Sequence, residues 1–245
     1  MPNAITPELL LQAYAMGVFP MAETRDSDDI HWVDPRLRGV IPLDGFHLSR
    51  SLARSIRQGG FTITTDRDFA GVVTACADRP ETWINDRIFK LYKALHSMDR
   101  AHSLEVWQGG LLVGGVYGVA LGAAFFGESM FSRVTDGSKI ALAYLVHRLR
   151  AGGFTLLDTQ FLTSHLASLG AVEIPRAAYR AKLAAALKTA ATFTPPGYHP
   201  PSVLPASSAG ASSGATPSGE AASSGTSSTS GKARSGTSQR KTQTS

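Results

Sequence analysis

Cysteine is almost absent from this chain, which contains only Cys76 among its 245 residues. A single cysteine excludes a disulfide within the chain and also excludes metal sites built on cysteine pairs. Cys76 lies in the apolar pattern VVTACA, which is typical of a buried helix position. The seven histidines are scattered and no pair has HExxH spacing, so the sequence predicts no metal centre.

Long apolar runs are absent as well. No segment approaches the roughly 20 uninterrupted apolar residues that a membrane-spanning helix needs. The N-terminal sequence MPNAITPELLL also lacks the charged start and the small-residue cleavage site of a signal peptide. We therefore expect a soluble, cytoplasmic protein.

Aromatic residues are missing from the C-terminal end of the chain. From Pro200 onward the sequence consists mostly of Ser, Gly, Ala, Thr and Pro. Such a segment cannot bury enough apolar surface to offset the entropy that is lost on ordering. We therefore expect residues 196–245 to form a disordered tail, and the sequence suggests no function for it.

A strong excess of positive charge is also absent from the rest of the chain. The net charge is +5, but the tail contributes +3 of it, because it holds four Lys and Arg residues against Glu220. The remaining +2 predicts only local contacts with RNA and allows small-molecule chemistry equally. Arg50, Arg54 and Arg57 share one face of a predicted helix and are the first RNA-binding candidates, although such a row is also typical of a solvated face.

Two helices are predicted before residue 60. The sequence Thr6-Pro7-Glu8 supplies an N-cap, a proline at the first helical position and an early acid, which predicts a helix from Pro7 to about Met16. A second helix begins near Ser49. Gly59-Gly60 then marks the boundary of a small N-terminal domain, residues 1–60.

A regular order of elements follows from Phe61. Apolar periodicity predicts a strand, two helices, three antiparallel strands, a helix, a strand and a helical end that is interrupted at Ile174-Pro175. Gly109-Gly110 predicts a hairpin between the first two of the three strands. This is the element order of the GCN5-related acyltransferase (GNAT) fold, so we expect an α+β protein whose GNAT-like domain spans residues 61–195. Order alone does not establish function, but it directs attention to acyl transfer.

The glycine-rich stretch from Gly114 to Arg133 holds one carboxylate, Glu128, among apolar residues. Glycines allow backbones or a ligand to approach closely, and a carboxylate in such a setting needs a partner or a task. Asp158 and Gln160 lie two residues apart near the end of a later strand, so they share one face. These three residues predict a site that holds an amine and takes its proton, although a buried polar pair that ties strands together has the same spacing.

Two other chemistries fit the sequence less well. Ser129, Asp158 and His165 occur in the order of a hydrolase triad, but Phe131 occupies the position where a nucleophile elbow needs glycine. A coenzyme A pyrophosphate needs a glycine-rich loop at a helix start, whereas the corresponding stretch RVTDGS places the acid Asp136 there.

Several blocks between about Thr6 and Tyr179 resemble, in order, the leucyl/phenylalanyl-tRNA–protein transferase family. They include AYAMGVFPM, WVDPRLRGVIPLDGFHLSRSL, AHSLEVW, GESMFSR, LLDTQ and HLASLGAVEIPR. The resemblance implies transfer of Leu or Phe, and possibly Met, from aminoacyl-tRNA to the N-terminal amine of proteins that begin with Lys or Arg, which marks them for degradation under the N-end rule. It implies no cofactor, metal or membrane, because the aminoacyl ester is already activated.

The resemblance also implies roles for individual residues. The catalytic aspartate and glutamine of the family match Asp158 and Gln160, and its essential glutamate matches Glu128. Asp158, directly or through Gln160, would polarise or deprotonate the attacking amine. Glu128 would position the substrate's own amino group or the cationic end of the acceptor.

The remaining implied residues bind substrate. The pocket for the amino-acid side chain would be lined by Val116, Phe125 and Met130, and Trp83 would hold the terminal adenosine, with Trp32 and Tyr14 as further candidates. Two alternatives remain open: a GCN5-related enzyme with another acyl donor, and a non-catalytic module that binds tRNA ends or basic N-termini.

Overall fold

The computed structural model describes residues 5–27 and 29–204. Most of the predicted tail, residues 205–245, lies outside the described residues. Within residues 196–204, the Tyr198 hydroxyl lies 2.9 Å from Nδ1 of His147, and Leu204 is buried. Packing therefore extends beyond residue 196, the predicted start of the tail.

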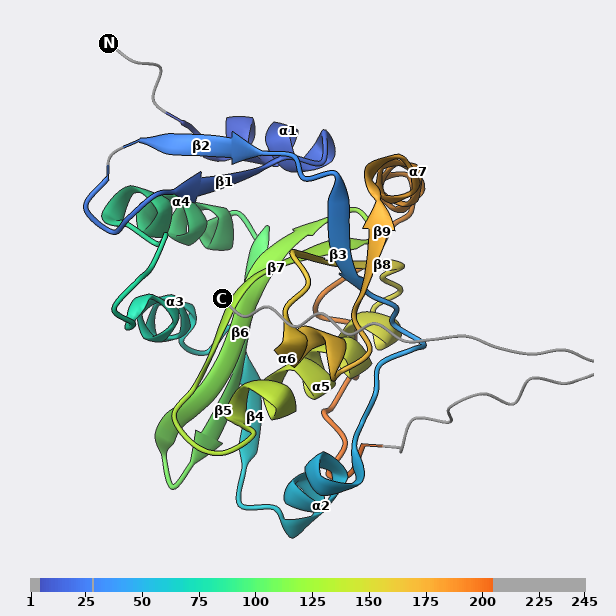
Figure 1. Ribbon diagram of the computed structural model, residues 1–245. Coiled ribbons are helices and arrows are strands. Elements are labelled where there is room, and N and C mark those ends of the chain that lie inside the picture. The colour runs from blue at the N-terminus through green and yellow to red at the C-terminus, as the bar shows by residue number, and fades with distance from the viewer. Residues whose placement is uncertain (1–4, 28, 205–245) are drawn as a thin grey trace, which may run out of the picture. The chain divides into compact units, whose positions relative to one another are not determined.

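A seven-stranded sheet forms the centre of the fold (Figure 1). Its strands, in spatial order, are β4 (Thr62–Thr65), β5 (Ala101–Gln108), β6 (Leu111–Leu121), β7 (Ala124–Ser132), β8 (Leu156–Gln160), β3 (Leu37–Ile41) and β9 (Val172–Pro175). Neighbouring strands are antiparallel except for β7 and β8, which are parallel. Two further strands, β1 (Phe19–Ala22) and β2 (Ile30–Val33), pair with each other in a separate small sheet.

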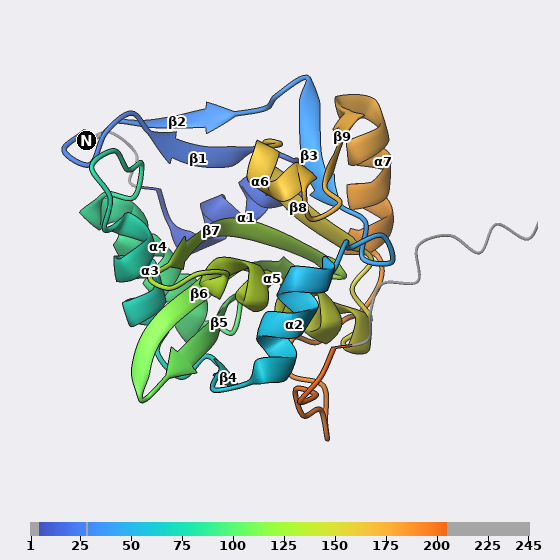
Figure 2. The same ribbon diagram turned by 60° about the horizontal axis from the view of Figure 1, so that its bottom comes forward.

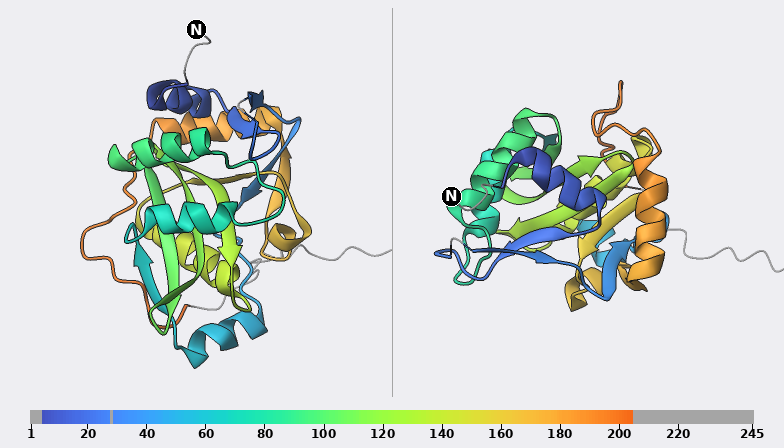
Figure 3. Two further views of the ribbon diagram at one scale, coloured as in Figure 1. Left: turned by 90° about the vertical axis from the view of Figure 1, so that its left-hand side faces the viewer. Right: turned by 90° about the horizontal axis from the view of Figure 1, so that it is seen from above.

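Helices cover both faces of the central sheet. Figure 3 shows α3 (Phe69–Ala77) and α4 (Asp86–Ser97) across one face, with α1 (Pro7–Ala15) beside α4 and α7 (Arg176–Leu187). The other face packs against α5 (Gly137–Ala151), and α2 (Arg50–Gln58) lies on that side against α5 (Figure 2). The short helix α6 (Ser164–Ala167) follows β8. No helix within the described residues is long and apolar enough to cross a membrane.

Local sequence signals account for where these elements begin. The Thr6 side chain accepts a hydrogen bond from Leu9 N at 3.2 Å, so the predicted cap is present. Ser49 accepts one from Leu52 N at 3.2 Å and caps α2, which begins where a helix is predicted. Gly109 and Gly110 have φ of 58° and 81° and connect β5 to β6, as the hairpin prediction requires. The predicted α+β class is confirmed, and the order of elements predicted from Phe61 onward agrees with the structure except for β9.

Strand β3 connects the N-terminal part of the chain to the main sheet. It precedes Gly59-Gly60, yet it pairs with β8 on one side and with β9 on the other. Residues on both sides of the predicted domain boundary therefore contribute to one sheet, and the division at residue 60 stays a prediction. Strand β9 was not predicted, because the sequence around Ile174-Pro175 indicates only a break between helices.

Candidate active site

The site lies where β7 and β8 separate. Their parallel ladder ends at the pair Phe126–Asp158, although β7 continues to Ser132 and β8 to Gln160. Two adjoining cavities open beyond that point. An inner cavity of about 80 Å³ has aliphatic walls, and an outer cavity of about 250 Å³ leads from it. The residues that line both cavities are Glu128, Ser129, Met130, Thr159, Gln160 and Leu166.

A β-bulge sets the direction of Glu128. Gly118 of β6 faces Gly127, and Tyr117 faces Ser129, so Glu128 is the extra residue on β7. Bulges often redirect a side chain next to an active site. The bulge needs Gly118, because a Cβ there would lie 2.2 Å from the carbonyl oxygen of Phe126. At least one glycine of the glycine-rich stretch, Gly118, is therefore required by this bulge.

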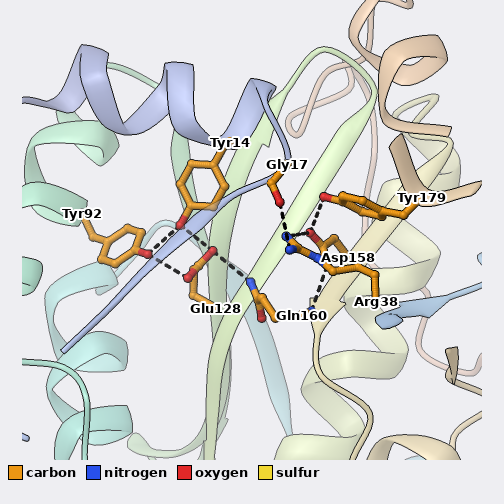
Figure 4. A network of polar contacts seen from close by, with 8 residues as sticks. All are labelled: Tyr14, Gly17, Arg38, Tyr92, Glu128, Asp158, Gln160 and Tyr179. Carbon is orange, nitrogen blue, oxygen red and sulfur yellow. Dashed lines mark hydrogen bonds and ion pairs between the residues drawn. The ribbon is translucent and has the colours of Figure 1, made fainter. Parts of the chain in front are cut away.

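Glu128 is buried among uncharged hydrogen-bond donors (Figure 4). The Tyr14 and Tyr92 hydroxyls donate to Oε1 and Oε2, each at 2.7 Å, and Gln160 Nε2 donates to Oε1 at 3.2 Å. Burial also raises the pKa of both phenols, so they stay protonated as donors.

The pKa of Glu128 itself is raised to about 7. Burial is the main cause and the Asp158 charge adds to it, while the two phenol hydrogen bonds and the charge of Arg38 oppose it. A carboxyl group with this pKa can both accept and release a proton near neutral pH.

Asp158 has the opposite kind of environment. It is fully buried, and Arg38 donates from Nε to Oδ1 at 2.9 Å and from Nη2 to Oδ2 at 2.6 Å. The Tyr179 hydroxyl also donates to Oδ2 at 2.7 Å, and Gln160 N to Oδ1 at 2.8 Å. Asp158 lines neither cavity, so its carboxylate faces the protein and not a substrate.

Arg38 ties several elements to that carboxylate. Its guanidinium lies 4.5 Å from the ring centroids of both Phe19 and Tyr179, and Nη1 donates to the carbonyl oxygen of Gly17 at 3.0 Å. Burial alone would lower the pKa of Arg38, but the hydrogen bonds and charge of Asp158 raise it above its ordinary value. The Arg38–Asp158 pair joins β3, β8, α7 and the turn after α1.

Gln160 connects the two carboxylates. Its backbone has φ of 59°, a left-handed conformation that non-glycine residues adopt rarely, and its N–H bond to Asp158 helps to hold it there. Its side chain donates to Glu128 and lines both cavities. Within the described part of the chain its amide oxygen has no hydrogen-bond partner, which leaves that oxygen available to a ligand.

Of the three residues implied for amino-acid binding, two line a cavity and one does not. Val116 and Met130 line the inner cavity. Phe125 lines neither cavity and instead packs in the core against Phe154 and Phe193, with ring centroids 6.1 and 5.5 Å away. Phe125 thus supports the fold of β7 from the α5 side.

The residues implied for adenosine and RNA binding lie in different parts of the structure, and only Trp83 among them lines a cavity. Trp83 lines the outer cavity with its ring edge toward Tyr92, whereas Trp32 is exposed on β2 and lines neither cavity. Tyr14 is buried behind Glu128. The three arginines of the predicted RNA-binding row are exposed on α2, which contributes to neither cavity. The proposed roles of all these residues stay predictions.

Sequence reasoning missed three of the residues that build the site. Tyr92 has the spacing of an ordinary core residue of α4, Tyr179 that of α7, and Arg38 stands in the unremarkable sequence RLRGVIP. The only available signal is a polar atom at an otherwise apolar position. Such a signal does not identify the carboxylate, far away in the sequence, to which each of these residues donates a hydrogen bond.

Other chemical groups contribute little here. No cluster of three or more His, Cys, Asp or Glu side chains suitable for a metal ion occurs among residues 5–27 and 29–204. Burial raises the pKa of Cys76 to about 12, so this thiol is not a nucleophile at neutral pH. Asp136 occupies the N-cap of α5 and pairs with Lys139 at 2.9 Å, which places a carboxylate where coenzyme A phosphates would need backbone amides.

Comparison with known proteins identifies the family. A family model for leucyl/phenylalanyl-tRNA protein transferase matches residues 40–184, and the model for the N-terminal domain of the same transferase matches residues 3–36. The chain is 68% identical over 196 residues to the leucyl/phenylalanyl-tRNA–protein transferase of Cereibacter sphaeroides, which covers 80% of this chain and 92% of that protein. It is 67% identical over 190 residues to the transferase of Ruegeria pomeroyi, over 78% of this chain and 90% of that protein.

Solved structures include more distant matches. The crystal structure of FemX aligns with a TM-score of 0.48 and 13% identity, over 68% of this chain and 66% of that chain. The two family models together cover both the N-terminal segment and the main sheet, and the identities extend over most of both chains. The chain therefore belongs to the leucyl/phenylalanyl-tRNA–protein transferase family.

Proposed function

We propose that this aminoacyltransferase moves leucine or phenylalanine from its tRNA to the N-terminal amine of proteins that begin with Lys or Arg, and that the reaction occurs where the inner and outer cavities meet. The observation that carries the proposal is the position of Glu128 and Gln160 between an aliphatic cavity and an aromatic one. The product would be a cytoplasmic protein marked for degradation.

The inner cavity suits an apolar amino-acid side chain. Its walls include Val116, Leu142, Leu145 and Leu157, and its volume of about 80 Å³ is the smallest of the cavities described here, which suits a compact apolar group. Met130 closes one side, and the flexible thioether of methionine lets the same wall adapt to phenylalanine. Trp83 in the outer cavity offers a surface on which the terminal adenine can stack.

The reaction is aminolysis of the aminoacyl ester. The acceptor nitrogen forms a bond to the ester carbonyl carbon, the bond from that carbon to the ribose oxygen breaks, and the amine proton ends on the ribose oxygen. The acceptor reacts as its neutral amine, which is partly populated at pH 7 because an N-terminal amine has an ordinary pKa near 8. A carboxylate with a pKa of about 7 can accept the proton that the nitrogen loses once it has attacked. Protonated Glu128 then returns a proton to the leaving ribose oxygen.

Gln160 and Asp158 have supporting roles in this proposal. The free amide oxygen of Gln160 accepts a hydrogen bond from the attacking amine and so orients it. Asp158 is a positioning residue, because it holds the backbone of Gln160 and is itself closed off by Arg38 and Tyr179. Of the two routes expected from the sequence, this proposal keeps the one in which Asp158 acts through Gln160, and it assigns the proton transfer to Glu128.

The tRNA body makes its contacts elsewhere. Arg50, Arg54 and Arg57 are exposed at i, i+4 and i+7 on α2, which suits phosphate groups that lie outside the cavities. These arginines would contribute to tRNA affinity without entering the reaction.

The test uses radiolabelled leucyl-tRNA and a peptide that begins with Arg. We expect transfer without any acyl-coenzyme A, and we expect Glu128→Gln to lower the rate of transfer by about 100-fold or more while tRNA binding is retained. The matched control is Glu173→Gln, which makes the same chemical change at an exposed position on β9. Binding without transfer in the unmodified protein would support the non-catalytic alternative, and dependence on acyl-coenzyme A would support another donor.

A further inference from the structure

A third cavity continues from the outer one. It has a volume of about 290 Å³, and its polar lining includes Arg79, Arg133, Ser132 and Asp78; we name it the arginine cavity. Arg79 and Met130 line both this cavity and the outer cavity, and Met130 also lines the inner cavity. The three cavities therefore form a series that runs from aliphatic to aromatic to cationic surroundings.

Arg79 stands at the junction of the last two cavities and is held in place. Its Nε donates to the carbonyl oxygen of Cys76 at 2.9 Å, and Nη2 donates to Ser129 Oγ at 3.3 Å and to the carbonyl oxygen of Met130 at 3.1 Å. Among the described residues, Nη1 has no hydrogen-bond partner. A fixed guanidinium with one free edge is well suited to binding an anion such as phosphate.

Arg133 supplies a second cation to the lining of the same cavity. Its guanidinium lies 5.6 Å from the Phe131 ring centroid, and Nη1 donates to the carbonyl oxygen of Leu112 at 3.4 Å. Asp78 is the one acidic residue among the described residues of the cavity lining, and it is exposed. Two guanidinium groups therefore face one solvated carboxylate, and the cavity retains positive charge.

We propose that the arginine cavity binds the phosphodiester groups at the 3′ end of the donor RNA, with Arg79 on the phosphate that precedes the terminal adenosine and Arg133 on the next one. The inference rests on the proposed function, because that function places the terminal adenosine in the outer cavity. A single RNA strand carries one phosphate per nucleotide, so a strand that leaves the outer cavity through the junction meets Arg79 first and Arg133 second. The series of cavities thus gives the path of the tRNA end.

The experiment compares donors that differ only in phosphates. Leucyl-adenosine has none, the leucyl ester of the dinucleotide CpA has one, and leucyl-tRNA has the complete strand. We expect Arg79→Gln to lower kcat/KM at least about tenfold more for the CpA ester than for leucyl-adenosine, because a hydrogen bond to a charged group is lost only with the former. Arg133→Gln should lower kcat/KM for leucyl-tRNA more than for the CpA ester.

Two further variants keep the outcome interpretable. Arg67→Gln removes an exposed guanidinium that packs 4.7 Å from the Trp107 ring centroid beyond β4, and it should leave the ratio between donors unchanged. Asp78→Asn removes the opposing charge and should lower the KM for phosphate-bearing donors severalfold. Equal losses with all donors in Arg79→Gln, or an unchanged KM in Asp78→Asn, would overturn the phosphate assignment. Absence of transfer from every donor in the unmodified protein would instead overturn the proposed function.

Discussion

Glu128 and Asp158 are two buried carboxylates on neighbouring strands, yet their surroundings differ in one respect. Asp158 has a guanidinium as its main partner, whereas the hydrogen-bond donors of Glu128 are two phenols and an amide. An opposite charge offsets much of the cost of burying a carboxyl group such as that of Asp158. Neutral donors offset only part of the desolvation of Glu128, and its pKa stays near 7.

The comparison separates structural from chemical roles. A carboxylate that is fully satisfied by Arg38, Tyr179 and a backbone amide is suited to fixing geometry. A carboxyl group with a pKa near the working pH, beside a cavity, is suited to moving protons. Burial alone therefore does not distinguish a catalytic carboxylate from a structural one, and the charge of the partner does.

The largest effect is expected from removing the cation. Arg38→Met leaves Asp158 buried without a counter-charge, so the free energy of unfolding at pH 7 should fall by about 3–5 kcal/mol. Urea unfolding measures this change. The matched control is Arg180→Met, which breaks an exposed pair with Asp34 and should cost no more than about 1 kcal/mol. Similar small losses in both variants would show that the buried pair does not anchor the site.

The next effect concerns the pH dependence of stability. The pKa of Glu128 is raised on folding, so between pH 4.5 and about 7 the folded protein holds more protons than the unfolded chain. Stability then falls as the pH rises through this range, by about 3 kcal/mol in total, since each pKa unit corresponds to about 1.4 kcal/mol. Glu128→Gln should lack this decline. Parallel stability curves for the two proteins would contradict the raised pKa.

A smaller effect is expected from removing one neutral donor. The Tyr92 hydroxyl lowers the pKa of Glu128, so Tyr92→Phe should move the rising limb of the pH–rate profile upward by roughly one pH unit. Tyr117→Phe is a close control, because its ring also contacts Tyr92 but its buried hydroxyl has no partner among the described residues. A shift of equal size in Tyr117→Phe would mean that packing, and not the hydrogen bond, sets the profile.

The smallest effect concerns the wall of the inner cavity beside the two carboxylates. Met130→Ala enlarges this cavity and should raise the ratio of phenylalanine to leucine transfer roughly threefold to tenfold. The ratio is measured with both aminoacyl-tRNAs in competition. Met98→Ala, at an exposed methionine after α4, should leave the ratio unchanged. An unaltered ratio in Met130→Ala would remove this residue from the specificity wall.

Features set by neighbours in the sequence were predicted well. The cap at Thr6, the start of α2 near Ser49 and the Gly109-Gly110 hairpin all agree with the structure. Each depends on a few consecutive residues or on a strong periodic pattern. The sequence groups Gln160 and Glu128 in one site, and the structure brings them into hydrogen-bond contact, while their roles stay predictions.

Features set by long-range contacts were not predicted. Tyr14 and Tyr92 approach Glu128 across 114 and 36 positions, and Arg38 approaches Asp158 across 120. No local pattern encodes such pairs. Strand β9 is missed for the same reason, since only its pairing with β3 makes a strand of a short segment that ends in Pro175. Phe125 shows a different difficulty. An apolar residue near a site has the same sequence pattern whether it lines the cavity or packs in the core behind the cavity wall.

The segment before residue 37 has a consequence for how this enzyme can be inhibited. It contributes the Tyr14 hydroxyl to Glu128, and the Gly17 carbonyl and the Phe19 ring to Arg38. A fragment that begins at residue 37 would contain every strand of the main sheet but would lack a hydrogen-bond donor to Glu128 and two contacts to Arg38, the partner of Asp158. A small molecule that lifts α1 away from α4 and α7 would therefore silence the enzyme without entering any of its cavities.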